Sequence, residues 1–287
     1  HLSTILLVLL FFVGLSVVLY PTVSNWWDQR HASRAIAGYD ETAQSLTPEN
    51  TDACFAAADD YNARLAADPD AFYDPEKITG YEDTLNISGT GIMGYITIDK
   101  INVQLPIYHG TSDSVLQVGV GHLQGTSLPV GGASTHCVLS AHRGLPSAVL
   151  FTNLDRLEAG DTFTVTVLDR LLTYEVDQIS IVLPEQVQDL LIADGQDYMT
   201  LMTCTPYGIN THRLIVQAKR VAYNGEDDAP TQPVQAVIHY TARSFRRAYT
   251  LYIGAAVIIL LVVVLILRRR KKRHSPKATP HNSRLTA

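Results

Sequence analysis

The sequence is poor in cysteine, with three among 287 residues, and it has no Cys-x-x-Cys pair and no Cys/His spacing typical of a zinc site. This scarcity excludes a disulfide-rich scaffold and gives no indication of a metal or of an organic cofactor. Because three is an odd number, at least one thiol stays free even where disulfides form. A disulfide between Cys54 and Cys137 is one arrangement that the sequence leaves open.

Basic residues are scarce outside the C-terminal end. Eight of the 22 Lys and Arg follow residue 267, where no Asp or Glu occurs, so the rest of the chain has 14 basic against 28 acidic residues. Nucleic-acid binding requires basic patches that neutralise phosphates, so the acidic body excludes nucleic acid as a partner. The basic tail 268–287 is better explained as a topology signal in contact with anionic lipid.

Two long runs without charge, 2–20 and 250–267, have about the 20 residues that a membrane-spanning helix needs. A basic block after the second run stays in the cytoplasm, which predicts a cell-membrane protein with residues 21–249 outside and the tail inside. The alternative for segment 1–20 is a cleaved signal peptide. The run is long for that purpose and no clear cleavage site follows, so an N-terminal transmembrane anchor is favoured.

Segment 21–66 is predicted to be a helical accessory segment. Thr47-Pro48 begins a helix, one face of which carries Cys54, Ala58, Tyr61 and Leu65, and Asp68-Pro69 ends it. Residues 67–90 are rich in Asp, Pro, Gly, Asn and Ser and predict a surface segment without regular structure. Residues 223–249 are expected to be a polar linker that leads to the second apolar run.

Short β-branched segments dominate from residue 92 onward. In segment 162–168, apolar residues alternate with three threonines, which is typical of a strand with one buried face. Many short strands and few long helices predict a mainly β domain over residues 91–222, as a barrel or a sandwich. The strands are expected at 92–98, 101–107, 136–141, 162–168, 172–179, 198–204 and 213–221. Short helical turns are expected at 112–117 and 147–157.

A thiol acyl-transfer site is indicated by three residues at strand ends. Cys204 ends an apolar strand and precedes a turn-rich loop, and Arg213 opens the next strand. If these strands are antiparallel neighbours, the guanidinium can stabilise both a thiolate and the oxyanion of a tetrahedral intermediate. His142 follows another apolar strand and can exchange protons with a leaving and an incoming amine.

Each of these residues also has an ordinary structural explanation. A cysteine after an apolar strand is most often a buried small hydrophobe, and an arginine at a strand start is usually a surface group. The chain has ten histidines, and four others compete with His142 for the same role: His109, His122, His136 and His212.

The motifs around these residues resemble the sortase family. Segment 200–213 reads Thr-Leu-Met-Thr-Cys-Thr-Pro-Tyr-Gly-Ile-Asn-Thr-His-Arg and resembles the Thr-Leu-x-Thr-Cys signature of sortases, with the extension of the pilus-type class C enzymes. The resemblance covers about residues 80–221. Four other segments resemble the same family: 93–98, 105–110, 121–132 and 139–146.

The resemblance implies a closed eight-stranded sortase-type β-barrel with short helices, an N-terminal helical and lid segment, and two flanking transmembrane helices. It implies a transpeptidase that cuts a Leu-Pro-x-Thr-Gly-like (LPXTG-like) sorting signal between Thr and Gly. Cys204 would attack the threonine carbonyl and form a thioester, and Arg213 would hold substrate and stabilise the oxyanion. His142 would protonate the departing glycine amine and then help to deprotonate the resolving amine.

In class C enzymes the resolving amine resembles a pilin lysine, so the implied product is an isopeptide-linked pilus on a Gram-positive surface. The implied partners are pilin subunits, surface proteins with LPXTG-like signals and the lipid bilayer. His109, His122 and His212 would then be structural, and Cys54 and Cys137 would be packing residues.

A lid before the barrel is a further feature of class C sortases, which carry an Asp-Pro-aromatic motif there. The best match is Asp74-Pro75 within segment 67–90, although the third residue is Glu76 and not an aromatic. The resemblance implies that Asp74 pairs with Arg213. Asp68-Pro69 is a rival position, and a simple turn is the ordinary use of Asp-Pro. The ring could come from the two aromatic residues just before the motif, Phe72 and Tyr73.

Three other functions are weighed against pilus assembly. A housekeeping sortase would use the same site but attach proteins to cell-wall peptide, and the two apolar runs and the long segment before the barrel disfavour it. A non-catalytic surface binding module would leave Cys204 inert, which the joint presence of Cys204, Arg213 and His142 disfavours. A cysteine protease would let water resolve the thioester.

Overall fold

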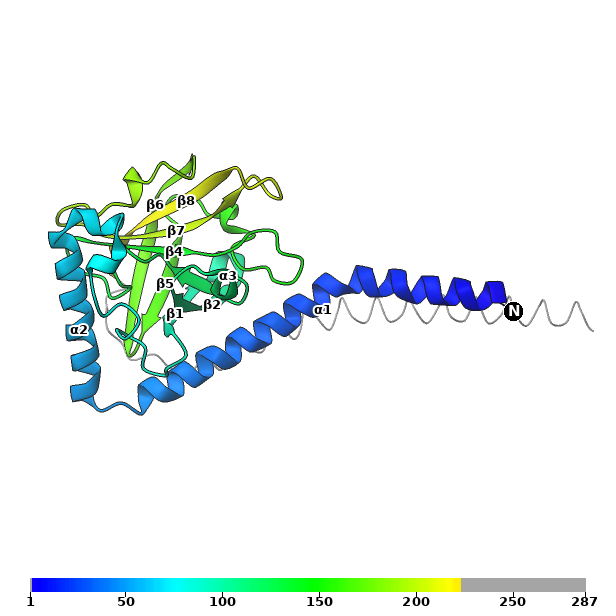
Figure 1. Ribbon diagram of the computed structural model, residues 1–287, viewed down its shortest axis with the longest axis horizontal. Helices are drawn as coiled ribbons and strands as arrows, with labels where there is room; N and C mark the ends of the chain where they lie inside the picture. The colour runs from blue at the N-terminus through cyan, green and yellow to red at the C-terminus, as the bar shows by residue number, and fades with distance from the viewer. Residues whose placement is uncertain (1, 223–287) are drawn as a thin grey trace, which may run out of the picture. The chain divides into compact units, whose positions relative to one another are not determined.

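The computed structural model describes residues 2–222, in which two helices precede a β-barrel (Figure 1). Eight strands close the barrel in the order β1-β2-β3-β4-β7-β8-β6-β5. The predicted mainly β fold and the closed eight-stranded barrel are therefore confirmed. The predicted linker 223–249, the apolar run 250–267 and the tail 268–287 lie outside the described residues.

The predicted strands all occur, with ends that differ by a few residues. One strand, β3, was not predicted, because its three residues are too few to show a period. The strands are β1 Ile92–Ile98, β2 Val103–His109, β3 Val120–His122, β4 Thr135–Ser140, β5 Thr162–Val167, β6 Arg170–Val182, β7 Asp197–Thr205 and β8 His212–Val221. The helices are α1 Leu2–Gln44, α2 Pro48–Ala67 and α3 Asp113–Leu116, with 3-10 turns η1 Pro69–Phe72, η2 Pro75–Lys77, η3 Asp99–Ile101, η4 Leu154–Arg156 and η5 Gln188–Leu190.

Two strand pairs of the barrel, β2–β3 and β4–β7, are parallel, and the other pairs are antiparallel. Alternate side chains fill the interior and the others face outward, as the pleat requires. The glycine in β3 is needed for space, because a Cβ at Gly121 would overlap the carbonyl oxygen of Gly110. Fully buried interior side chains include Ile96, Ile107, Leu139, Val165, Leu201 and Val216.

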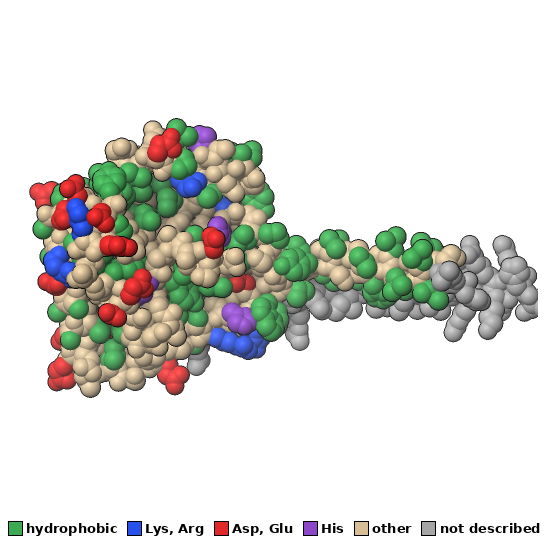
Figure 2. Space-filling model, in the orientation of Figure 1, with side chains coloured by type: hydrophobic (Ala, Val, Ile, Leu, Met, Phe, Trp, Pro, Cys, Tyr) green, Lys and Arg blue, Asp and Glu red, His purple; other side chains and the backbone are tan. Residues whose placement is uncertain are grey.

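Helix α1 is longer than predicted, because it continues through Pro21 to Gln44 where the sequence predicted two separate segments. A proline removes one backbone hydrogen bond, and here that loss does not end the helix. The N-terminal part carries no charge before Asp28, and its hydrophobic side chains are exposed (Figure 2). Its most apolar window has a mean hydropathy of 2.5, so α1 is long and apolar enough to cross a membrane.

The C-terminal part of α1 packs on the barrel through Ala32, Ile36 and Tyr39, all of which are buried. The Tyr39 hydroxyl donates to the carbonyl of Met93 at 2.8 Å and accepts from the amide of Leu168 at 2.9 Å. Because this buried hydroxyl both donates and accepts a hydrogen bond, it connects the helix to β1 and to the β5–β6 turn. Nearer the apolar part, Asn25 Oδ1 accepts from the amide of Val149 at 3.0 Å.

Helix α2 begins and ends as predicted. Thr47 caps it by accepting from the amide of Asn50, and Asp68 follows its last residue. Its buried face consists of Phe55, Ala58, Tyr61, Asn62 and Leu65, whereas Cys54 is half-buried at the edge of that face. The buried Asn62 side chain is satisfied, because it accepts from the amide of Leu128 at 2.7 Å and donates to the carbonyl of the same residue at 3.3 Å.

Segment 67–90 is not the irregular surface segment that its composition predicted. It contains the turns η1 and η2, and four of its apolar residues belong to the core: Ala71, Ile78, Tyr81 and Leu85. The Tyr81 hydroxyl accepts from the amide of Gly110 at 2.8 Å and lies 2.9 Å from Nδ1 of His122. Polar composition hid these few buried positions, which fasten the segment to the barrel.

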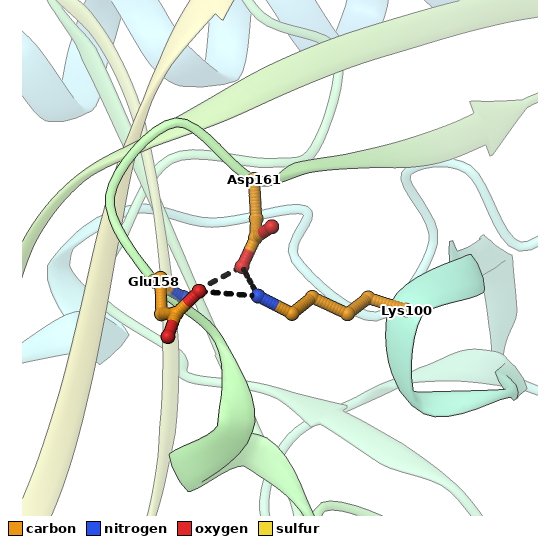
Figure 3. A network of polar contacts seen from close by, with 3 residues as sticks. All are labelled: Lys100, Glu158 and Asp161. Atoms are coloured by element: carbon orange, nitrogen blue, oxygen red, sulfur yellow. Dashed lines mark hydrogen bonds and ion pairs between the residues drawn. The ribbon is translucent and has the colours of Figure 1, made fainter.

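One exposed ion-pair network holds the turn after β1 against the start of β5 (Figure 3). Lys100 Nζ lies 2.9 Å from Glu158 Oε2 and 2.7 Å from Asp161 Oδ2. Asp161 also accepts from the amide of Glu158 at 2.6 Å. Exposed pairs of this kind contribute little free energy each, so the network shapes a turn and adds little to stability.

Candidate active site

Cys204 and Arg213 are brought together by the pairing of β7 with β8. The two residues are direct partners in this antiparallel ladder, and the loop 206–211 connects their strands. Side chains of paired residues point to the same face with Cβ atoms about 4.5–5.5 Å apart. The fold therefore places a thiol beside a guanidinium, as the sequence analysis expected.

His142 comes to the same place through the parallel pairing of β4 with β7. Ser140 is paired with Met202. His142 lies two residues beyond Ser140, and Cys204 lies two residues beyond Met202, so the parallel register brings His142 level with Cys204. The Ala141 amide donates to the carbonyl of Met202 at 3.2 Å, and the Thr203 hydroxyl donates to the carbonyl of Ala141 at 2.7 Å. The three predicted residues thus lie at neighbouring strand ends, with His142 just after β4, Cys204 in β7 and Arg213 in β8.

All three side chains are half-buried, so substrate can reach them while part of the water is excluded. The guanidinium of Arg213 donates to the carbonyls of His212 at 3.2 Å and Asn210 at 3.4 Å. Among residues 2–222, no ion pair includes Arg213. A cation that has no carboxylate partner can bind an anionic or polarised oxygen beside Cys204.

The outward face that carries Cys204 and Arg213 continues into an apolar cluster, here called the outer cluster. Met202 and Ile215 lie two residues from Cys204 and Arg213 along their strands, so all four side chains share this face. The outer cluster has Val138, Leu190 and Ile215 at its centre, surrounded by Phe72, Leu123, Val182, Val187 and Met202. This apolar surface beside the thiol suits an extended peptide with apolar side chains.

The predicted lid residues divide into one that covers this face and three that do not. Phe72 is half-buried and packs on the outer cluster, whereas Tyr73 is 65% exposed. Asp74 is exposed at the start of η2, Pro75 is half-buried in that turn, and no ion pair in the described part of the chain includes Asp74. The expected pairing of Asp74 with Arg213 is therefore wrong for this structure, and the contact with the face is made by an aromatic ring.

A cavity of about 450 Å³ lies between the end of α2 and residues 190–194. Its lining includes Leu65, Pro69, Phe72 and Ile192, and none of His142, Cys204 and Arg213. The three proposed reacting groups therefore do not line the cavity, although Phe72 and Leu190 belong both to its lining and to the outer cluster.

The other cysteines and histidines have structural surroundings. Cys54, Cys137 and Cys204 are all free, so the disulfide that the sequence left open is not formed. Burial raises the pKa of the Cys137 thiol well above its usual value, which keeps it protonated and unreactive. The competing histidines bond to nearby groups: His109 to the carbonyls of Thr84 and Gly91, His122 to Tyr81 and Ser127, His136 to Leu191 and Thr200, and His212 to Thr211.

Among residues 2–222, no group of three or more His, Cys, Asp and Glu is arranged to hold a metal ion. One residue next to the site escaped the sequence analysis. Arg143 follows His142 directly, and its side chain is only 10% exposed and paired with Asp155. A charged residue right after an apolar strand was the available signal, but its burial depends on a partner twelve residues away that no local pattern reveals.

The chain is similar to known proteins in sequence and in fold. Residues 96–221 match the family model of the Sortase domain. The chain is 31% identical over 131 residues to Sortase A of Streptococcus agalactiae serotype III (strain NEM316). That match covers 45% of this chain and 52% of the relative, so the chain spans about half the length of this curated relative.

Solved structures are more similar. The crystal structure of sortase C1 from Streptococcus agalactiae is 46% identical, with a TM-score of 0.61, and the match covers 66% of this chain and 99% of that one. Sortase C1 of GBS Pilus Island 1 is 42% identical, with a TM-score of 0.61, over 69% of this chain and 97% of that one.

Proposed function

The chain belongs to the sortase family, and we propose that it is a cysteine transpeptidase that cleaves an LPXTG-like signal between Thr and Gly and joins the acyl group to a pilin lysine. The observation that carries this proposal is the pairing of Cys204 with Arg213, with His142 two residues beyond the end of β4, the strand on the other side of β7. In this proposal Cys204 is the nucleophile, Arg213 the cation that stabilises the oxyanion and His142 the proton carrier, which are the groups that acyl transfer through a thioester requires.

The first half of the reaction forms the thioester. The Cys204 thiolate attacks the threonine carbonyl carbon, and the oxygen becomes an oxyanion that the Arg213 guanidinium binds. The tetrahedral intermediate then breaks its C–N bond. The protonated His142 gives its proton to the departing glycine amine, and the acyl group stays on sulfur.

The second half reverses the proton flow. The lysine amine attacks the thioester carbonyl, neutral His142 takes a proton from the attacking nitrogen, and Arg213 again binds the oxyanion. The C–S bond then breaks and the Cys204 thiolate is restored. The product is an isopeptide bond, and both half-reactions use the same three groups.

Two features support pilus assembly over attachment to cell-wall peptide. The solved relative at 42% identity is described as a sortase C1 of a pilus island. In addition, α1, α2 and segment 67–90 precede the barrel, and Phe72 from that segment lies on the outer cluster. We assign to this segment the role of a lid that must move before a sorting signal can bind.

The proposed location is the outer face of the cell membrane. Helix α1 is apolar and exposed over its first half, and the basic block after residue 267 favours a cytoplasmic C-terminal tail. The proposed partners are membrane-tethered pilin subunits and other surface proteins with LPXTG-like signals.

The test incubates the full-length protein in detergent with an LPXTG-like peptide and a pilin domain, and identifies the products by mass spectrometry. We expect an isopeptide bond from the threonine carbonyl to a lysine side chain. Transfer only to a cell-wall peptide amine would indicate a housekeeping enzyme, and release of a free carboxylate alone would indicate a protease. No cleavage of any peptide would indicate a binding module.

The variant that accompanies this test is Cys204→Ala, which should abolish cleavage and leave the fold intact because no other group can form the thioester. Cys54→Ala is the matched control, since Cys54 is also half-buried and free. We expect full activity in that control, and turnover by Cys204→Ala would overturn the mechanism.

A further inference from the structure

Arg143 lies beside the proposed site but has no part in the chemistry described above. Its side chain is 10% exposed, and its guanidinium Nη2 lies 2.5 Å from Asp155 Oδ2. Arginine is rarely buried without a partner, because removing its charge from water is costly. The ion pair offsets that cost and fixes the guanidinium between the residues that follow β4 and the residues that follow β7.

The same guanidinium contacts the segment that follows Cys204. Its Nη1 donates to the hydroxyl of Thr205 at 3.4 Å, and its central carbon lies 6.0 Å from the centre of the Tyr207 ring. Each contact is long and weak taken singly. Together with the ion pair, these contacts connect the Arg143 side chain both to Asp155, in the segment after β4, and to the segment after Cys204.

Tyr207 also lies against the backbone of the His142 loop. A Cβ at Gly144 would lie 3.1 Å from the nearest atom of the Tyr207 ring, and Gly144 has a φ of +80°. Glycine is therefore needed there both for its backbone conformation and for the space that the ring occupies. The Gly144 amide donates to the Thr152 hydroxyl at 3.1 Å, which holds this backbone in place.

The contacts of Arg143 do not satisfy all of its donors. Its Nε is buried and has no hydrogen-bond partner. An unsatisfied buried donor costs stability, so the position of this arginine is not the one that stability alone would select. Arg143 itself, however, directly follows His142, and its hydrogen-bond partner Thr205 directly follows Cys204.

We propose that Arg143 is a positioning residue that holds the β7–β8 loop against the His142 loop, and so keeps His142 and Cys204 in register through both acyl transfers. This inference rests on the proposed function. Arg143 would act through its contacts with Thr205 and Tyr207, and no hydrogen bond, ion pair or ring contact joins it to the side chains of His142, Cys204 or Arg213 among residues 2–222. A displacement of about 1 Å between catalytic groups can cost roughly a hundredfold in rate.

The experiment compares Arg143→Met with Arg156→Met in the full-length protein. Arg156 lies in the same loop region but is exposed, so it is a matched control for the loss of one arginine. We expect Arg143→Met to lower kcat for peptide cleavage by roughly 10- to 100-fold while KM stays nearly unchanged. Arg156→Met should behave as the wild type, and Arg143→Lys should fall between, because lysine keeps the charge but not the planar fork.

A double-mutant cycle with Tyr207→Leu tests whether Arg143 acts through Tyr207. If Arg143 acts through the β7–β8 loop, Tyr207→Leu also lowers kcat, and the double variant is no slower than Arg143→Met. If the two single variants lower kcat independently, so that their effects multiply in the double variant, the inference is overturned. A wild-type kcat in Arg143→Met would also overturn it. If Arg143→Met fails to fold, Tyr207→Leu decides alone, since its side chain is 59% exposed, and a wild-type kcat there would overturn the inference.

The rate at which a neutral thiol reagent modifies Cys204 separates this inference from the proposed function. In a Cys54→Ala, Cys137→Ala background, we expect Arg143→Met and Tyr207→Leu to raise that rate severalfold and Arg156→Met to leave it unchanged. A wild-type protein that cleaves no peptide but shows this pattern would contradict the proposed function and support the link between the loops. Equal modification rates in all variants would contradict the link.

Discussion

Arg213 faces Cys204 across one pair of the β7–β8 ladder, and its guanidinium donates only to two carbonyl groups of its own loop among the hydrogen bonds of the described residues. This arrangement keeps a full positive charge available to an oxyanion. Loss of one such donor typically costs roughly a hundredfold or more in turnover.

Arg213→Lys should therefore lower kcat by roughly a hundredfold, because lysine supplies the charge but not the planar fork of donors. The melting temperature should change little, since no ion pair of the folded state is broken. Steady-state cleavage of a sorting-signal peptide measures the effect. Wild-type rates in this variant would place Arg213 outside the reaction.

His122 is a residue whose protonation affects the fold and not the site. Burial lowers the pKa of His122 to about 4. Its Nε2 donates to the carbonyl of Ser127 at 2.8 Å, which leaves Nδ1 to accept from the Tyr81 hydroxyl at 2.9 Å. A second proton on the ring would remove that acceptor, so the folded state requires the neutral form.

Acid should therefore destabilise the protein through His122. The unfolded chain binds the proton near pH 6.5, so the stability that is present above this pH is lost as the pH falls toward 4. Burial raises the pKa of Asp28 and of Asp40 to about 6, which acts in the opposite direction, but both carboxyls are only about half buried and their effect is screened.

The measurement is the free energy of unfolding in denaturant at pH 7 and pH 5. We expect wild type to lose on the order of 2 kcal/mol more than His122→Asn over this range. His212→Asn, which changes a histidine with an exposed hydrogen bond, is the control and should follow the wild type. Identical pH dependence in His122→Asn and wild type would show that this histidine does not titrate as its burial requires.

At the scale of elements, the turn η1 brings Phe72 onto the outer cluster while its neighbour Tyr73 stays exposed. If this ring covers the approach to Cys204, Phe72→Ala should speed modification of Cys204 by a thiol reagent and raise the rate of peptide cleavage. Both effects follow because only the uncovered fraction of molecules binds.

Tyr73→Ala is the matched control for this prediction, since it removes an adjacent aromatic ring that lies in solvent. Asp74→Ala should also be silent, because no ion pair holds Asp74 among residues 2–222. Accelerated modification in Asp74→Ala but not in Phe72→Ala would show that the aspartate holds the segment closed.

Elements with a strong local pattern were predicted correctly from the sequence, and elements with a weak one were not. Alternation in Thr162–Val167 and the capped start of α2 at Thr47 predicted the right elements because one face of each is buried regularly. The buried positions of segment 67–90 are too sparse for a period. The contact that fixes Phe72 depends on residues from β4, β7 and β8, which no window of the sequence contains.

The site was predictable to a similar degree. Cys204 and Arg213 fall on consecutive strands joined by a short loop, so their pairing follows from one turn. The position of His142 depends on a parallel pair, β4–β7. Its place after an apolar strand made it a candidate among several histidines, and the family resemblance selected it. The role expected for Asp74 came from a motif that this chain keeps only in part.

At the scale of the whole molecule, the apolar α1 and the basic residues after 267 predict that the barrel lies outside the cell membrane and the C-terminal tail in the cytoplasm. Protease added to intact protoplasts should remove the Cys204 domain and spare a tag placed after Ala287. Immunoblots for the tag and for the barrel measure this directly. Digestion of the tag from outside would reverse the predicted topology.

The place of β7 in the barrel also determines when the site can exist. β7 and β8 come last among the described strands, yet they lie between β4 and β6, so the barrel stays open on that side until both are in place. Ala141 and Thr203, which share a hydrogen bond at this seam, are 62 residues apart, and such distant pairing forms slowly. A chain still emerging from the ribosome therefore carries His142 and later a thiol, but no acyl-transfer activity, until its final strands complete the wall.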